Sequence, residues 1–429
     1  MGFTISEKCR EQLQDLRPEL DAAIRAHRQA DCRLRVCDLA GNPVPDAEVR
    51  VEQTDSDFMF GCNCLWLGQL GDGNARYEEL LAGLFNTVTT TFCLSDMQPE
   101  PGVWRFADTA PEVFRRPPSD RVIAFARRHG LRLKGQPLLA GSWYPQWARE
   151  QNLDENGIKD LYLDYFRRVA ERYGDSFACF DLVNEAFCHT GFPLYEPEVN
   201  YVDWAFRAAR ALFPRSVDLF VNEAPCHCWD IPAESGENRY FNLLSRLSCN
   251  GCAPDGVGFQ FHLWQTVRGM VDGEGAYSFP RLRRQLAEYA KLGMPLYVSE
   301  ITVPSCLDGE VNEEAQAELI AACYRLFFAV PEMRGILQWN LCDGKAWLKE
   351  GESRGGVVDE FLRKKPAYLA LEHLLRREWR TALQCRTAAD GVVAFRGFTG
   401  GYTVTVTKNS QKRTFRFSTA APDAPLVLV

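Results

Sequence analysis

The chain has 429 residues, of which 46% are hydrophobic and 12% aromatic, and it carries a formal net charge of −8. This hydrophobic share is ordinary for a folded protein, and the length allows one large α/β domain with additional structure beside it. Because the charge is negative, neither nucleic acid nor an anionic membrane surface is expected as a partner.

The first residues, Met1 to Lys8, lack the basic start and apolar run of a signal peptide. No stretch of 18 or more apolar residues is present to span a membrane. We therefore expect a cytoplasmic protein whose 16 cysteines are reduced, or a secreted one if a leader has been removed.

Helical spacing of leucines predicts a helix over residues 5–29, and the pattern then changes to alternation typical of strands. Residues 32–53 are expected to form a hairpin, and residues 383–429 contain three further short strands. Since a lone hairpin is marginally stable, these segments are expected to pack together. The predicted division is an N-terminal helix (1–30), a small β-sandwich (31–56 with 380–429) and a central domain (57–379).

The central region alternates strand-like and helical segments and predicts a (β/α)₈ TIM barrel. A doubly wound open sheet is the alternative, but the Gly-rich phosphate loop typical of that fold is missing. The strands are expected at 58–63, 87–92, 131–137, 177–184, 217–222, 256–262, 296–300 and 335–341. Helices between them include 122–128, 161–172, 281–292 and 314–328.

Two glutamates close strands of this predicted barrel, Glu185 after strand four and Glu300 at the end of strand seven. Active sites of such barrels lie at the carboxyl ends of the strands. Two carboxyl groups about 5–5.5 Å apart can cleave a glycosidic bond with retention, one as general acid/base and the other as nucleophile. We expect Glu185 to be the acid/base, with a pKa raised by burial and by the second carboxylate, and Glu300 to be the nucleophile.

Other residues at these strand ends have a structural and a functional interpretation. His262 is equally compatible with core packing and with a catalytic neighbour, and the same holds for Trp339 and Trp347. For Glu223 we favour a salt bridge or a position turned away from the site. The cysteine–histidine group at 226–228 and the cysteines at 249 and 252 are expected on opposite faces, so no metal site and no cofactor is predicted.

These segments resemble glycoside hydrolase family 10, the xylanase family, over about residues 58–375. Asp181–Ala186 is similar to the W-D-V-V-N-E-A block with the acid/base, and Val298–Ile301 to the I-T-E-L-D block with the nucleophile. The resemblance implies further substrate-binding residues around these two glutamates. They are Asn184, Asn222, Gln260, His262, Trp339 and Trp347, with Gln136 and Trp143 from the third-strand region.

Two blocks depart from the family pattern. In the second-strand block T-x-E-N-x-M-K-W, the Glu, Asn and Lys that hold a glycone-side sugar are replaced by Thr91, Phe92 and Ser95. In the third-strand block, Gln136 stands where the family has its first His. Because an unpaired buried hydroxyl costs about 1–3 kcal/mol, these losses weaken glycone-side binding, and Phe92 is expected to close that side sterically.

The sequence thus predicts a retaining β-glycosidase of the family 10 type, acting on β-linked xylosides or related gluco-configured oligosaccharides and glycosides. Asn184 is expected to bind the sugar 2-hydroxyl, Gln260 and His262 to orient Glu300, and Trp339 and Trp347 to form a sugar platform. One alternative is an endo-1,4-β-xylanase with rebuilt subsites. Another, from a different class, is a catalytically silent carbohydrate-binding protein. The oligomeric state is left open.

Overall fold

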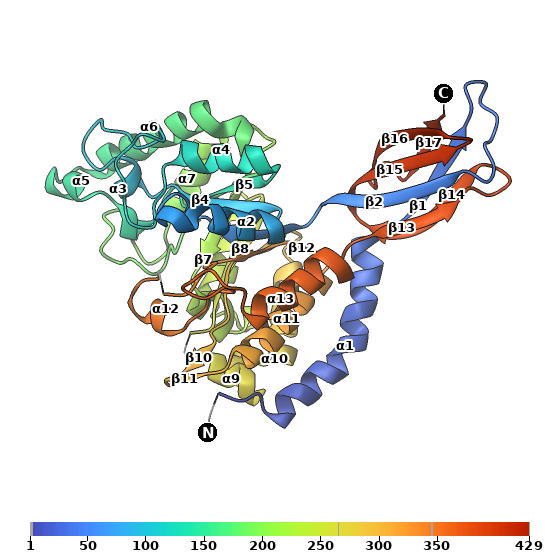
Figure 1. Cartoon of the computed structure of the whole chain (residues 1–429). Helices are drawn as coiled ribbons and strands as arrows, with labels where there is room; N and C mark the ends of the chain where they lie inside the picture. Colours follow the sequence, from blue (N-terminus) through green and yellow to red (C-terminus); the bar gives the residue numbers. More distant parts are fainter. Residues whose placement is uncertain (1–2, 265, 345, 429) are drawn as a thin grey trace.

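The computed structural model describes residues 3–264, 266–344 and 346–428 and contains a closed barrel with a small β-sandwich beside it (Figure 1). The barrel order is β12-β3-β4-β5-β6-β7-β8-β9, and neighbouring strands are parallel. This confirms the predicted (β/α)₈ barrel. Its strands are β3 (Met59–Asn63), β4 (Thr87–Thr91), β5 (Arg132–Gln136), β6 (Cys179–Asn184), β7 (Asp218–Glu223), β8 (Gly256–His262), β9 (Leu296–Thr302) and β12 (Met333–Gln338).

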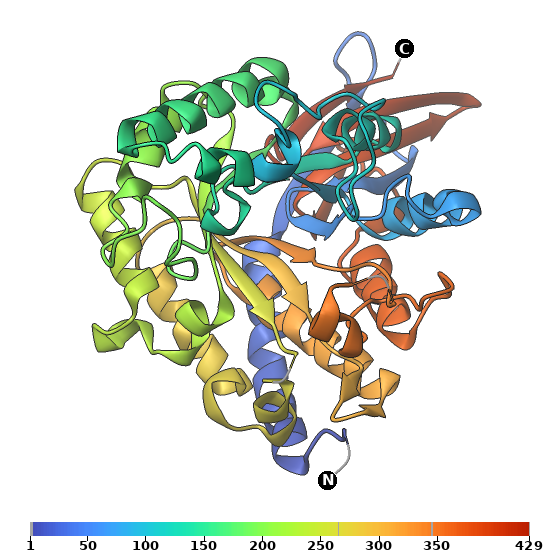
Figure 2. The ribbon, with the colours of Figure 1, turned by 90° about the vertical axis from the view of Figure 1, so that its left-hand side faces the viewer.

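Amphipathic helices surround the barrel and bury their apolar faces against the strands. Figure 2 shows this ring with the barrel toward the viewer and the sandwich behind it. The helices of the central domain, including the short ones in its connections, are α2 (Asn74–Leu84), α3 (Leu94–Met97), α4 (Ser119–His129), α5 (Gln146–Glu150), α6 (Glu155–Tyr173), α7 (Tyr201–Arg210), α8 (Arg239–Cys249), α9 (Val267–Asp272), α10 (Phe279–Ala290), α11 (Glu313–Ala329), α12 (Leu348–Glu352) and α13 (Pro366–His373). A short hairpin of β10 (Cys306–Leu307) and β11 (Glu310–Val311) precedes α11.

The two ends of the barrel differ in the polarity of the side chains that they bury. Cys179, Phe220 and Tyr297, with Met59 against them, form a separate buried cluster near the amino-terminal ends of their strands. The carboxyl ends carry buried polar side chains instead, including Gln136, Asn184, Asn222, Gln260 and Glu300. Packing at one end of the barrel therefore supports a polar site at the other.

The sandwich consists of two sheets, β14-β1-β17 and β13-β2-β15-β16. Its strands are β1 (Gln29–Cys37), β2 (Glu48–Ser56), β13 (Ala382–Arg386), β14 (Val392–Phe398), β15 (Gly400–Lys408), β16 (Gln411–Ser418) and β17 (Asp423–Val427). Their alternate residues share one core, among them Leu34, Val49, Val404 and Leu426. The predicted hairpin is wrong, because β1 and β2 lie in different sheets and each pairs with C-terminal strands. Burial of both apolar faces across the sandwich outweighs local pairing.

Helix α1 (Glu7–Arg28) lies against α11 and leads directly into β1, so it connects the barrel with the sandwich (Figure 1). Ser6 caps its first turn by accepting a 3.1 Å hydrogen bond from the Cys9 amide. At its end, the buried Arg28 guanidinium donates to the carbonyl of Phe328 at 2.7 Å and to that of Val330. Within the described residues, no helix has the length and apolar character needed to span a membrane.

Candidate active site

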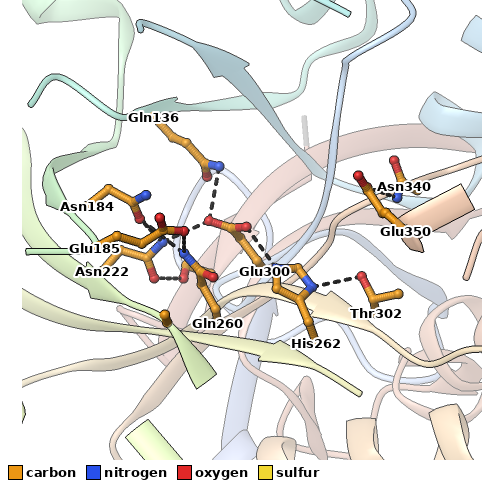
Figure 3. Close-up of polar contacts among 12 residues, drawn as sticks. Gln136, Asn184, Glu185, Asn222, Gln260, His262, Glu300, Thr302, Asn340 and Glu350 are labelled. Carbon is orange, nitrogen blue, oxygen red and sulfur yellow. Dashed lines mark hydrogen bonds and ion pairs between the residues drawn. The ribbon is translucent and has the colours of Figure 1, made fainter. Parts of the chain in front are cut away.

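Glu185 and Glu300 belong to one hydrogen-bonded network at the carboxyl ends of the barrel strands (Figure 3). Asn222 Nδ2 lies 2.8 Å from both Glu300 Oε1 and Asn184 Oδ1. Gln260 Nε2 lies 2.9 Å from Glu185 Oε1 and 3.3 Å from Asn184 Oδ1. The structure thus brings together the two predicted catalytic residues, which are 115 positions apart in the chain, through three of the predicted binding residues.

Glu300 is buried, with 3% of its surface exposed, and both of its carboxyl oxygens have partners. Oε1 accepts hydrogen bonds from Gln136 Nε2 at 3.1 Å and from Asn222. Oε2 lies 3.1 Å from His262 Nε2, and the other ring nitrogen of His262 lies 2.9 Å from the Thr302 hydroxyl. These contacts fix the orientation of the carboxylate, so His262 is a member of the site rather than only a core residue.

An irregularity in strand pairing helps to place Glu300. Phe259 pairs with Val298, whereas the next residue, Gln260, pairs with Glu300, so Ser299 is an extra residue in β9. The Ser299 hydroxyl donates to Asn222 Oδ1, which leaves the amide nitrogen of Asn222 facing Glu300. Bulges of this kind re-aim side chains and are common beside active sites.

A buried ion pair supports Gln136. Lys134 and Asp181 are fully buried and form a salt bridge, and Lys134 Nζ also donates to Gln136 Oε1 at 3.1 Å. Because that oxygen accepts from Lys134, the amide nitrogen of Gln136 faces Glu300. Burial raises the pKa of Asp181 to about 6; Lys134 opposes this effect and the charge of Glu300 adds to it.

Glu185 follows β6 in the left-handed backbone region, with φ +53°, and its amide donates to the Asn222 carbonyl at 2.9 Å. Its carboxyl group is partly exposed, and Oε2 lies 2.8 Å from His189 Nε2. Burial raises the pKa of Glu185, but hydrogen bonds from His189 and Gln260 outweigh burial and leave it below its ordinary value. The expectation of a raised pKa was therefore wrong, because the local donors stabilise the carboxylate.

His189 was not identified from the sequence, although it is one of only six histidines and stands four residues after Glu185. Lys134, Ser299 and Thr302 were also missed. They adjoin strand-end residues in the chain, and strand alternation offered a signal for Lys134, which lies two residues before Gln136 and on the same face.

The three predicted aromatic residues lie in different surroundings. Trp339 packs edge-on against the His262 ring at 5.7 Å, so it adjoins the network. Trp347 is 48% exposed and packs against Phe114 at 5.2 Å. Trp143 packs beneath the Arg116 guanidinium at 4.8 Å. The roles of Trp347 and Trp143 in binding sugar stay predictions.

A second network joins the segment after β4 to the segment after β12. The fully buried Arg115 side chain donates to both carboxyl oxygens of Glu350 at 3.1 Å and to Asn340 Oδ1 at 2.9 Å. Figure 3 shows Asn340 and Glu350 set apart from the Glu300 network, at the right of the view. Arg115 and Glu350 lie 235 positions apart, and no local pattern in the sequence predicts that contact.

The expectation for Phe92 is overturned, and one of the two alternatives for Glu223 is excluded. Phe92 does not close the sugar side, because it is fully buried and packs edge-on against Tyr173, Phe177 and Phe180 at 5.7, 5.4 and 5.3 Å. Its ring lies in the apolar core, where burial of aromatic surface is most favourable. For Glu223 the salt-bridge alternative is wrong, since no ion pair to it occurs in the described part of the chain. Glu223 is fully buried and accepts hydrogen bonds from the amides of Ala224 and Phe187, not from the Glu300 network, which agrees with the alternative that it is turned away from the site.

The sequence model of glycosyl hydrolase family 10 matches residues 55–374. The chain is 26% identical over 322 residues to endo-1,4-beta-xylanase B of Neocallimastix patriciarum, covering 72% of this chain and 34% of that protein. It is 24% identical over 273 residues to endo-1,4-beta-xylanase B of Thermotoga neapolitana, covering 61% of this chain and 74% of that protein. A crystal structure of xylanase 10B from Thermotoga petrophila in complex with xylobiose has the same barrel fold, with a TM-score of 0.60 and 22% identity. The match covers 75% of this chain and 95% of that chain.

Proposed function

The chain belongs to glycosyl hydrolase family 10, and from this premise we propose that it hydrolyses β-linked xylosides or related gluco-configured glycosides by double displacement. One observation carries the proposal: Asn184, Asn222 and Gln260 join Glu185 and Glu300 in a single network. Two carboxyl groups held in one network suit an acid/base and a nucleophile that act on the same acetal.

In the proposed first step, Glu300 attacks the anomeric carbon as the glycosidic C–O bond breaks. The departing oxygen takes a proton from Glu185, and a covalent glycosyl-enzyme forms. Gln136, Asn222 and His262 hold Glu300 in place through their contacts with its two oxygens. Asn184 hydrogen-bonds the sugar 2-hydroxyl, a contact that strengthens in the transition state.

In the second step, Glu185 removes a proton from water, whose oxygen attacks the anomeric carbon and releases Glu300. The lowered pKa of Glu185 favours the carboxylate that this step requires. The first step uses the protonated form instead, whose share grows as the pH falls. The two roles of Glu185 therefore depend on pH in opposite directions.

The substrate is proposed to be a short oligosaccharide or an aglycone conjugate. Thr91 and Ser95 cannot replace the three polar contacts of the family's second-strand block, and Phe92 lies in the core. The buried contact of Arg115 with Glu350 joins the segments that follow β4 and β12. These features favour recognition of few sugars on the glycone side.

An endo-1,4-β-xylanase is the second candidate, since the two named relatives carry that name. Incubation with xylan and, separately, with nitrophenyl β-xyloside and β-glucoside distinguishes the two. The proposal predicts turnover of the small glycosides and little release from xylan, whereas a ladder of oligomers from xylan supports the endo-xylanase. If wild type and Glu300→Gln bind carbohydrate alike and neither turns over any glycoside of a broad panel, the protein is a silent carbohydrate-binding protein.

A further inference from the structure

A mixed cluster of potential metal ligands adjoins the turn that carries Glu185. One ligand atom each of Cys188, Glu223 and His227 lies within 4.8 Å of the other two. Cys188 follows Glu185 in the turn after β6, Glu223 ends β7, and His227 lies in the π-helix η4 (Cys226–Asp230). The three come from successive barrel segments, and Cys188 Sγ is 3.6 Å from Glu223 Oε1.

Glu223 is a buried carboxyl group that has no positively charged partner among the described residues. It is fully buried, and its partners are the amides of Ala224 at 2.8 Å and Phe187 at 3.4 Å, together with the Cys188 thiol. None of these carries a charge, and no ion pair to Glu223 occurs among the residues that the structure covers. Burial first, with the charge of Glu185 in addition, raises the pKa of Glu223 to about 8. A buried carboxylate of this kind is stable when it is protonated or when it binds a cation.

We propose that Cys188, Glu223 and His227 bind a divalent transition-metal ion of the zinc type. Sulfur, imidazole nitrogen and carboxylate oxygen together are the ligand set that zinc prefers, whereas magnesium and calcium prefer oxygen alone. With bonds of about 2.0–2.3 Å, a tetrahedral zinc site places ligand atoms about 3.5 Å apart. The spacing of the thiol and the carboxyl oxygen already fits that edge.

The surroundings suit entry of an ion from solvent. Cys188 is exposed and His227 is partly exposed, so the cluster is open on one side, where water can fill the fourth position. Binding replaces the thiol proton of Cys188, and that of Glu223 where it is protonated, with the ion, so those protons are released to solvent. This site differs from the two groups that local spacing suggested, 226–228 and the cysteines at 249 and 252. Only His227 belongs to either of them, and the other two ligands, Cys188 and Glu223, belong to neither.

Occupancy links the ends of β6 and β7 to η4 and should stabilise the folded state, because the unfolded chain does not hold the three ligands together. The bound ion would hold in place the turn after β6. That turn includes Glu185, whose carbonyl accepts a hydrogen bond from the Cys188 amide at 3.1 Å. The ion is therefore proposed as a structural support for the turn that carries Glu185.

Titration of the chelator-treated, full-length protein with Co²⁺ tests the site directly, because thiolate ligation gives an intense near-ultraviolet absorption band. We expect saturation at one ion per chain, loss of the band in Cys188→Ser, and at least about 10-fold weaker binding in His227→Ala. Cys249→Ser, which removes another exposed thiol, is the matched control and should bind as wild type does.

Thermal unfolding with and without Zn²⁺ provides an independent measurement and shows whether each variant is folded. We expect Zn²⁺ to raise the Tm of wild type and of Cys249→Ser but not of Cys188→Ser. Absence of the near-ultraviolet band in wild type overturns the proposal. Equal binding by all four proteins also overturns it and indicates adventitious association. Neither readout depends on glycosidase activity, so the result is separate from the proposed function.

Discussion

His189 Nε2 lies 2.8 Å from Oε2 of Glu185, while the other oxygen of that carboxyl group accepts from Gln260 at 2.9 Å. Both contacts favour the ionised acid, and together they outweigh the effect of burial on its pKa. The proposed acid/base thus rests as a carboxylate, and its protonated share in the free enzyme falls as the pH rises through this lowered pKa.

Replacement of His189 by alanine should shift the pH dependence of kcat/KM. Since His189 lowers the pKa of Glu185, its removal lets burial dominate and raises that pKa. The alkaline limb of the profile, which reports loss of the protonated acid, should move to higher pH. Initial rates on a glycoside with a poor leaving group measure this shift, with His129→Ala as a control on an exposed histidine. An alkaline limb that stays in place or moves to lower pH contradicts the assignment.

Replacement of Glu300 by glutamine should abolish turnover, with a loss of more than about 10³-fold in kcat, because the amide cannot form the glycosyl ester. Glu288→Gln alters a partly exposed glutamate on α10 that is paired with Lys291 and lies outside the active site, and it should retain full activity. Steady-state rates on nitrophenyl glycosides compare the two. Activity of Glu300→Gln within about 10-fold of wild type would rule out its role as nucleophile.

Replacement of Glu185 by alanine should affect substrates according to their leaving groups. A poor leaving group needs the proton from Glu185, so we expect a loss of about 10²–10⁴-fold in the first step. A good leaving group such as dinitrophenolate departs without that proton, and its glycosylation rate should fall far less. Burst kinetics with both substrate types measure the difference. An equal loss for both types would show that Glu185 does not act as the acid.

Replacement of Lys134 by methionine should destabilise the barrel. It should also loosen the orientation of Glu300, because Gln136 loses the contact that turns its amide nitrogen toward that carboxylate. The variant leaves Asp181 as an unpaired buried charge, which costs about 3–5 kcal/mol of unfolding free energy. The double variant Lys134→Met/Asp181→Asn removes that charge and should recover part of the stability. Urea unfolding measures both. A single variant as stable as wild type would show that the pair does not support the fold.

The barrel could be predicted from the sequence because most of its strands contain short apolar runs and alternate with amphipathic helices. The bounds of β12 differ from the predicted ones: the strand was expected at 335–341 and is found at Met333–Gln338. The sandwich was predicted as a unit, but the pairing of β1 and β2 was not. Alternation predicts which face of a strand is buried and gives no information about which distant strand lies beside it.

The two glutamates and their amide partners could be predicted because each lies in the last residues of a buried strand or directly after it. The contacts that determine the pKa of Glu185 and the orientation of Glu300 could not be predicted from the sequence in the same way. Neither the His189 contact with Glu185 nor the orientation of Gln136 by Lys134 follows from strand patterns alone, since each depends on side-chain geometry in the folded state. For the same reason the pKa of Glu185 was predicted in the wrong direction.

Trapping with fluoro-sugars whose glycosylation is fast and whose hydrolysis is slow tests whether Glu300 is the nucleophile. Fluoro-xylosides and fluoro-glucosides are each incubated with the intact enzyme, and the labelled peptide is identified by mass spectrometry. We expect one sugar per chain, esterified to Glu300, and the sugar that labels faster is the preferred one. A label on another residue, or none while the enzyme turns over the parent glycoside, would contradict the assignment of Glu300 as nucleophile.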